Sequence, residues 1–420
     1  MLSRWRAKAG HFLKALGPGV TTGAADDDPS GIATYSVVGA QFGTGFLWAA
    51  WFTWPLMGCV QMMCARVGMV TGMGLAGALR QKFPRWLVAL IAVALLLANV
   101  INIASDLSGM ADAAQMLGAG RSQVWVWVFG LGISLATVRL RYHQIAGVLK
   151  WLALALAAYV VAAFMVTSDW PAVLKATVLP SLPKGGAAWG ALVAILGTTI
   201  SPYLFFWQAG QEVEEEKAKG RLLLISRKGA TDSELHDRRI DIGVGTFFSN
   251  IVMFFVILTT ALTLHAHGMT SIGTTRQAAE ALRPLAGNGA YLLYTIGLVG
   301  TGLLAIPTLA GSAAYAFAET FDWTYGLDEK FRNALSFYAV FIVATVAGAA
   351  LDLLRIDPIK ALYWSAIVNG LLAPFLLVAL FLVATDRRIM DGQTSSTTSR
   401  WVVGAATVIM FGAAVGMFVF

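Results

Sequence analysis

Long apolar runs separated by short polar segments dominate the chain. The plainest apolar cores cover residues 87–100, 148–166, 247–264, 335–351 and 371–384. A helix of about 20 apolar residues crosses the hydrocarbon layer, and every backbone amide inside that layer must be paired. The runs lack the alternation of a membrane barrel strand, so the pattern predicts transmembrane helices. Extending the cores to their polar boundaries gives about eleven spans, at 15–39, 45–70, 86–114, 122–138, 144–167, 187–210, 240–265, 288–318, 333–351, 358–384 and 400–419.

Composition agrees with an all-α polytopic membrane protein. Hydrophobic residues make up 57% of the 420 and charged residues 13%, and the mean hydropathy is +0.69. The formal net charge is +7, but the Lys and Arg residues sit mainly at helix ends. That distribution indicates membrane topology and argues against a nucleic-acid partner. We find no catalytic motif at membrane depth, so we expect a protein that is not an enzyme and has no cofactor.

The Lys and Arg bias orients the spans. If the N-terminus is cytoplasmic, residues 1–14 and the segment 211–239 fall on the basic side, whereas the opposite loops hold few cations. The positive-inside rule therefore predicts a multi-pass plasma-membrane protein with an odd number of spans. The charged segment 211–239 is expected to be a solvated cytoplasmic loop.

Two spans are interrupted where a helix should continue. Span one places Asp26, Asp27 and Asp28 directly before Pro29, and span six carries Pro202 at its centre. Proline breaks or kinks a helix and leaves carbonyls that protein, water or an ion must satisfy. An acidic residue at membrane depth costs at least about 2.5 kcal/mol and is usually functional. We therefore expect Asp28 and the free carbonyls to form an oxygen-lined cation site, with Asp26 and Asp27 there or in a water-filled vestibule.

The positions of the breaks suggest an internal repeat. Spans one and six are each the first helix of a five-helix unit, 15–167 and 187–384, with 400–419 as an appended helix. Paired discontinuous helices in two inverted halves point to the central site of a transporter. The expected architecture is one transporter domain, 1–420, with a 5+5 inverted repeat.

A polar stripe runs along span three. Asn99, Asn102 and Asp106 are spaced to share one helical face. The stripe either lines an aqueous route or forms hydrogen bonds between helices. Asn369 in span ten carries the same two interpretations.

Three short motifs resemble the natural-resistance-associated macrophage protein (Nramp) family. They are Gly17-Pro18-Gly19, Asp28-Pro29-Ser30-Gly31 and Ser105-Asp106. The resemblance implies a LeuT-like fold and transport of divalent metals. It also implies the metal ligands: Asp28, the carbonyls of Ala25 and Thr198, and the position of Ser201. Together with the polar positions noted above, it leads us to expect five further residues along the path or behind the ligands: Asp27, Gly31, Tyr203, Asp106 and Asn369.

The departures from the family pattern bear on the metal. Gly31, Ser201 and Tyr203 stand where the family has Asn, Met and His, and Gly109 replaces a Glu linked to proton movement. Loss of the soft thioether removes a preference for transition metals, and a wide oxygen-rich site suits a hydrated Mg²⁺. The pattern is similar to the Nramp-related magnesium transporters, which implies Mg²⁺ and also Mn²⁺ as substrates, without proton coupling.

We therefore expect a monomeric carrier of Mg²⁺ or Mn²⁺ in the lipid bilayer, working by alternating access. One alternative keeps the fold: a proton-coupled Mn²⁺ or Fe²⁺ transporter. Another changes the class: a cation channel, although channels more often form symmetric oligomers around filter rings.

Overall fold

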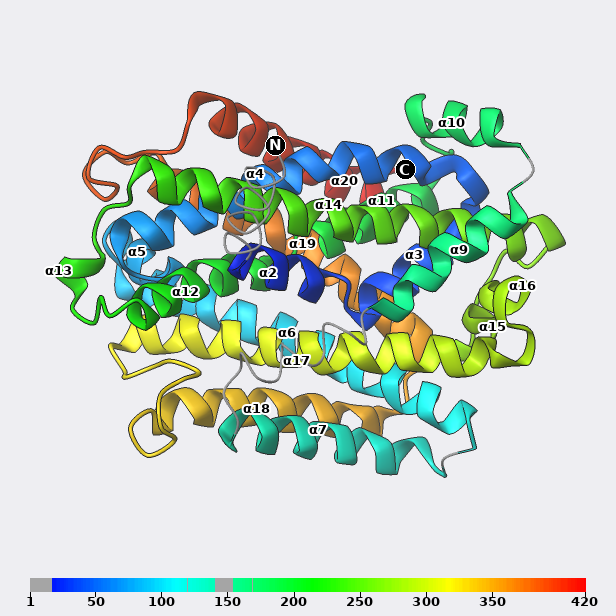
Figure 1. The fold of residues 1–420 in the computed structure, drawn as a ribbon, viewed down its shortest axis with the longest axis horizontal. Coiled ribbons are helices and arrows are strands. Elements are labelled where there is room, and N and C mark those ends of the chain that lie inside the picture. Colours follow the sequence, from blue (N-terminus) through cyan, green and yellow to red (C-terminus); the bar gives the residue numbers. More distant parts are fainter. Residues whose placement is uncertain (1–16, 119, 140–153, 168) are drawn as a thin grey trace, which may run out of the picture.

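The computed structural model describes residues 17–118, 120–139, 154–167 and 169–420, and every regular element in these ranges is a helix (Figure 1). The main helices are α2 (Pro18–Asp26), α3 (Pro29–Phe42), α4 (Leu47–Thr71), α5 (Leu75–Arg80), α6 (Arg85–Met116), α7 (Ser122–Arg139), α9 (Ala157–Val166), α10 (Trp170–Val178), α11 (Gly186–Thr199), α12 (Pro202–Ala218), α14 (Asp232–Thr263), α17 (Ala290–Phe321), α18 (Leu335–Leu351), α19 (Pro358–Ala384) and α20 (Thr397–Val419). Shorter helices α13 (Leu224–Arg227), α15 (Thr275–Ala279) and α16 (Arg283–Ala286) lie in the connections.

Each expected span has a helical counterpart in the described residues. Seven stretches are long and apolar enough to cross a membrane. The expectation for residues 144–167 is matched only by α9, because 140–153 lie outside the described residues, as do 1–16. Large apolar side chains such as Leu90, Leu97 and Phe248 remain exposed on the bundle, as expected of a surface that faces lipid.

Both predicted breaks are confirmed, and they share one local cause. Asp28 precedes Pro29 with φ −70° and ψ 169°, and Ser201 precedes Pro202 with φ −73° and ψ 131°. A residue before proline is driven out of the helical region, while proline itself fits the first turn of a new helix. Span one is therefore divided into α2 and α3, and span six into α11 and α12.

Long helices surround the broken pair. In Figure 1, α17 and α6 run together beside α2, with α18 and α7 beyond them, while α4, α14 and α20 lie on the other side. Glycine allows the closest approaches: a Cβ at Gly23 of α2 would overlap the backbone of Gly245 in α14, and one at Gly197 of α11 would overlap the Ala366 carbonyl of α19. Small residues let membrane helices pack backbone to backbone, which fixes both broken helices against their neighbours.

The expectation of a solvated loop at 211–239 holds only for its middle, where Leu222, Leu223 and Ile225 are 71%, 70% and 76% exposed. The two ends of the segment are helical and partly buried. Helix α12 continues to Ala218 and α14 already begins at Asp232, so the linking segment is short. Glu212, Arg238 and Asp241 are 1%, 6% and 0% exposed. The charges are buried because they pair with one another, which reduces the cost of removing them from water.

Candidate metal site

Asp28 lies at the break between α2 and α3 and is 2% exposed. Its Oδ1 accepts hydrogen bonds from the backbone amide of Gly31 and the hydroxyl of Ser30, both at 2.7 Å. Its Oδ2 accepts one from Nδ2 of Asn102 in α6, at 2.9 Å. Asp28 is thus the N-cap of α3, an arrangement in which the first turn favours a negative charge. Three donors orient the carboxylate, and none of them carries a positive charge.

Tyr203 connects the two breaks. Its hydroxyl donates to the carbonyl of Ala25 at 3.1 Å, so the second half of span six contacts the end of α2. The hydroxyls of Thr198 and Tyr35 are also hydrogen-bonded, at 3.1 Å, and join α11 to α3. The residues expected to act together from the two broken helices therefore lie side by side.

The hydroxyl of Ser201 forms hydrogen bonds with the C-terminal end of α11. Its hydroxyl donates toward the carbonyls of Gly197 and Thr198, each at 2.7 Å. The expected carbonyl of Thr198 thus has a donor already, as does that of Ala25. A carbonyl oxygen has two lone pairs and a hydroxyl oxygen accepts as well as donates, so each can still face a ligand.

Asp26 and Asp27 do not lie in an open vestibule, which corrects that alternative. They are 1% and 5% exposed. The hydroxyl of Ser249 in α14 donates to Oδ2 of Asp26 at 2.6 Å and lies 3.3 Å from Oδ1 of Asp27. The close packing of α2 on α14 buries both carboxylates in the described conformation.

The polar stripe of α6 divides into two roles. Asn99 donates to the carbonyl of Leu309 and the hydroxyl of Ser312 in α17, both at 2.8 Å, so it joins helices. Asn102 contacts Asp28 instead. Asp106 is fully buried, and its carboxylate interacts electrostatically with that of Asp28. Apart from a weak contact with the Ser30 amide, no donor among the described residues meets the Asp106 carboxylate.

The remaining expected positions are consistent with this centre but contribute less. A Cβ at Gly31 would sit 3.5 Å from both the Asp26 carbonyl and Oδ1 of Asp28, which is an ordinary contact. Position 31 therefore faces the Asp28 carboxylate with room for a side chain. Asn369 in α19 is 2% exposed, and its Oδ1 has no partner among the described residues. A Cβ at Gly109 would lie 2.9 Å from Cδ1 of Leu362, so a larger residue there requires Leu362 to move.

Sequence reasoning missed three supporting hydroxyls: those of Ser30, Ser249 and Tyr35. The Ser30 contact had a local signal, because Ser two residues after a helix-capping Asp can reach its carboxylate. Ser249 and Tyr35 contact residues 223 and 163 positions away. Such pairs depend on tertiary packing and leave no local pattern.

Four buried acids at this centre have no cationic partner among the residues that the structure describes. We name Asp26, Asp27, Asp28 and Asp106 the central aspartates. Within the described ranges none of them forms an ion pair with Lys, Arg or His. No group of three or more His, Cys, Asp or Glu side chains in those ranges is arranged to hold a metal unaided. A metal bound here would therefore also need carbonyls, hydroxyls or water.

A second group of acids lies nearer one end of the bundle, and two of its three members, Glu212 and Asp241, are buried. We call this end the N-side: it is where α2, α14 and α20 begin and where α4 and α12 end. Arg238 of α14 contacts Glu212 at 2.8 Å, Asp241 at 2.5 Å, and Glu215. These four residues form the Arg238 network. It differs from the central aspartates because one of its own members, Arg238, provides the positive charge.

Asp241 extends the network to the start of α2. Its carboxylate accepts hydrogen bonds from the backbone amides of Gly17, Gly19 and Val20, at 2.8, 2.7 and 3.0 Å. These amides have no partner within their own helix, and the negative charge suits a helix N-terminus. The network therefore holds the first half of span one against α12 and α14.

A bundle of membrane-length helices with two facing interruptions defines a membrane transporter of LeuT-like fold. The chain belongs to the natural resistance-associated macrophage protein-like family, whose profile matches residues 19–420. Among solved structures, a manganese transporter of Eremococcus coleocola aligns with a TM-score of 0.73 at 18% identity, covering 96% of this chain and 85% of that one. Mhp1, a nucleobase-cation-symport-1 family transporter, aligns with a TM-score of 0.56 at 13% identity, covering 96% and 92%. These alignments confirm the predicted fold class.

Curated relatives match over nearly their whole length. A divalent metal cation transporter MntH of Klebsiella pneumoniae (strain 342) is 26% identical over 415 residues, covering 95% of this chain and 93% of the relative. The protein of the same name from Aeromonas hydrophila is 24% identical over 411 residues, covering 95% and 94%. The family resemblance is thus confirmed, whereas the magnesium-transporting branch is not distinguished by these relatives.

Proposed function

We propose that the chain transports divalent metal cations across the membrane through a site centred on Asp28. The observation that carries the proposal is the set of central aspartates, which are buried together without a positive partner. Burying several carboxylates in a membrane protein is expensive unless a cation compensates them. A dication entering at the break supplies the missing charge.

The proposed ligands come from both broken helices. Asp28 provides the anionic ligand, and the carbonyls of Ala25 and Thr198 and the hydroxyl of Ser201 provide neutral oxygens. Asp27, Gly31, Tyr203 and Asn369 line the route, and water completes the coordination shell. Alternating access follows if release of the Arg238 network lets α2 move from α14 and opens the N-side.

Mn²⁺ is the first candidate substrate, and its transport is coupled to protons. The relatives are named for manganese or divalent metal transport. Asp106 is the proposed proton carrier, because its buried carboxylate interacts with Asp28 without a strong donor of its own. This reverses the order expected from the sequence, in which Mg²⁺ came before Mn²⁺.

Mg²⁺ without protons is the second candidate, favoured by the donor set. Oxygen donors surround the break, while Ser201 and Tyr203 replace the thioether and imidazole that favour softer metals. Mg²⁺ retains several waters and is commonly held through one or two carboxylates. The lack of a side chain at Gly31 leaves space for such a hydrated ion.

Reconstituted vesicles with an internal pH dye separate the two candidates. Mn²⁺ uptake with acidification, and weak competition by Mg²⁺, supports the first. Mg²⁺ uptake without acidification supports the second. Absence of uptake of both ions, in vesicles whose protein is folded, would reject the proposed function.

The proposed placement in the cell follows from the charge bias. We assign the N-side to the cytoplasm, because the Lys and Arg excess lies on that side, and the protein to the plasma membrane. We further propose that it works as a monomer. Labelling of single cysteines added to the N-side and the opposite loops in intact cells tests the assignment.

A further inference from the structure

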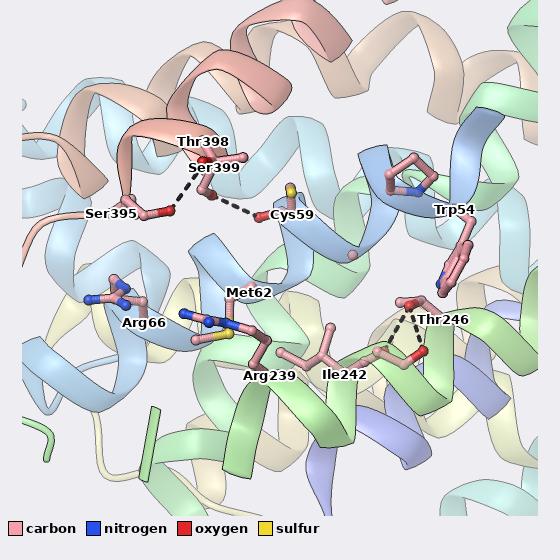
Figure 2. Close-up of a pocket in the computed structure, with 14 residues that line it drawn as sticks. Trp54, Cys59, Met62, Arg66, Arg239, Ile242, Thr246, Ser395, Thr398 and Ser399 are labelled. Carbon is pink, nitrogen blue, oxygen red and sulfur yellow. Dashed lines mark hydrogen bonds between the residues drawn. The ribbon is translucent and has the colours of Figure 1, made fainter. Parts of the chain in front are cut away.

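A cavity lies on the N-side, and none of the central aspartates lines it. It has a volume of about 520 Å³ and lies between α4, α14 and α20 (Figure 2). Its lining includes Arg66 of α4, Arg239 of α14 and a hydroxyl-rich stretch at the start of α20. Part of this lining, including Arg239, is exposed, so the cavity opens to the surface.

The guanidinium groups of Arg66 and Arg239 have no ion-pair partner in the described part of the chain. Arg66 makes only a long hydrogen bond, 3.4 Å, to the carbonyl of Gln393, and within the described ranges neither Arg66 nor Arg239 forms an ion pair. The charge of Asp232 reaches Arg66 only at longer range, while Arg66 and Arg239 repel each other. Two like charges facing one cavity indicate a place for an anion.

The start of α20 adds hydrogen-bond donors. Ser396 caps this 23-residue helix, and its side chain accepts from the Ser399 amide at 3.2 Å. The amides of Thr397 and Thr398, in the first turn, have no acceptor within the helix. A helix N-terminus of this kind favours a phosphate or carboxylate.

Ser395 gives an independent indication of a ligand. It lines the cavity and is 2% exposed, yet its hydroxyl has no hydrogen-bond partner among the described residues. A buried polar group of this kind usually has a partner. A phosphate oxygen bound in the cavity would provide one.

The other wall of the cavity is apolar. Trp54, Pro55 and Met62 line it, and the exposed Trp51 and Phe248 lie on the same two helices. The arginines stand near the N-side ends of their helices, whereas these apolar residues lie deeper along α4 and α14. A ligand that fits both walls has an anionic head and an apolar tail.

We propose that this cavity binds the phosphate of an anionic phospholipid. The headgroup lies between Arg66, Arg239 and the first turn of α20, with the Ser395 hydroxyl as a further contact. The acyl chains lie along the α4 surface near Trp54. This site is independent of the proposed transport site.

Lipid binding to the purified full-length protein tests the proposal. The probes are dioctanoyl phosphatidylglycerol, dioctanoyl phosphatidylcholine and inorganic phosphate, and the readout is the dissociation constant from thermophoresis. We expect phosphatidylglycerol to bind most tightly. In the Arg66→Gln/Arg239→Gln variant its binding weakens about tenfold or more, because two charges near the membrane surface are lost.

A matched pair of exposed arginines serves as the control. Arg387 and Arg388 lie near the same end of the bundle and do not line the cavity. Arg387→Gln/Arg388→Gln removes the same charge and should bind phosphatidylglycerol as the wild type does. Equal weakening in both double variants would reduce the effect to general surface charge and overturn the proposal.

A second variant fills the cavity and keeps the charges. A Cβ at Gly243, which lines the cavity in α14, meets no atom within 4 Å. Gly243→Leu should therefore fold and still lose phosphatidylglycerol binding. Unchanged binding in this variant, or equally tight binding of inorganic phosphate or phosphatidylcholine, would contradict an anionic-lipid site.

Discussion

The central aspartates and the two buried acids of the Arg238 network, Glu212 and Asp241, lie in one bundle under opposite electrostatic conditions. The network surrounds Arg238, which is 6% exposed, with three carboxylates and caps the start of α2 through Asp241. The central aspartates receive only neutral donors such as Ser30, Asn102 and Ser249. Buried carboxylates that are paired with a cation of the protein stabilise a contact between helices. Buried carboxylates without such a cation indicate that a cationic ligand binds there.

The largest expected effect is at the centre. Asp28→Asn keeps the size of the side chain and an acceptor for the Gly31 amide, but it removes the negative charge. We expect Mn²⁺ uptake by reconstituted vesicles to fall by at least about 100-fold. Thermal unfolding should be unchanged or slightly delayed, because a buried charge has been removed. Near-normal uptake in Asp28→Asn would remove this residue from the proposed site.

The next effect is on the N-side. Arg238→Gln leaves Glu212 and Asp241 buried without a cation, which should cost about 3–5 kcal/mol of stability. Thermal unfolding of the purified protein measures the loss. If Arg238→Gln unfolds at the wild-type temperature, the network does not hold α2 and the contrast between the two groups fails.

A smaller effect is expected from the donors around Asp28. Asn102→Ala removes one hydrogen bond to a charged acceptor, a loss of about 1.5–3 kcal/mol. The KM for Mn²⁺ should rise roughly tenfold or more. Asn99→Ala is the control on the same face of α6, since Asn99 bonds to α17, and its KM should stay near that of the wild type. Equal changes in both variants would assign the effect to helix packing.

The smallest effect is at an exposed pair. Arg80 contacts Asp322, whose side chain is 68% exposed, and Arg80 holds the pKa of that carboxyl below its usual range. Exposed pairs contribute about 0–1 kcal/mol, so Asp322→Asn, which removes only the exposed partner, should barely change thermal unfolding at neutral pH. A lowered pKa stabilises above the unfolded value of about 3.9, and the contribution is lost as pH falls below it. A large shift in the unfolding temperature would contradict the view that burial determines how much an ion pair contributes to stability.

The sequence was sufficient to predict both breaks, because their cause is local. An acid or hydroxyl before proline ends one helix and begins the next, as Asp28-Pro29 and Ser201-Pro202 do. The Asn102 and Asp106 face of α6 was also predictable from helical spacing. Most of the spans were predictable too, because a transmembrane helix requires a continuous run of about 20 apolar residues, which is a local feature of the sequence.

Pairings over long sequence distance could not be predicted. The charged residues of 211–239 suggested exposure to solvent. Instead, Arg238 donates a hydrogen bond to Glu212, 26 residues away, and Asp241 accepts one from the amide of Gly19, 222 residues away. Ser249 likewise buries Asp26 and Asp27, which had been expected either in the site or in open water. Metal preference depends on coordination by waters and carbonyls, which residue types alone do not fix.

The most direct test of the central claim is equilibrium binding of Mn²⁺ to the purified protein, with Asp28→Asn and Arg238→Gln compared under identical conditions. We predict saturable binding to a single site in the wild type, its loss in Asp28→Asn, and its retention in folded Arg238→Gln. Binding of Mn²⁺ to Asp28→Asn with wild-type affinity would contradict the account, because the metal would then not depend on the Asp28 carboxylate at that break.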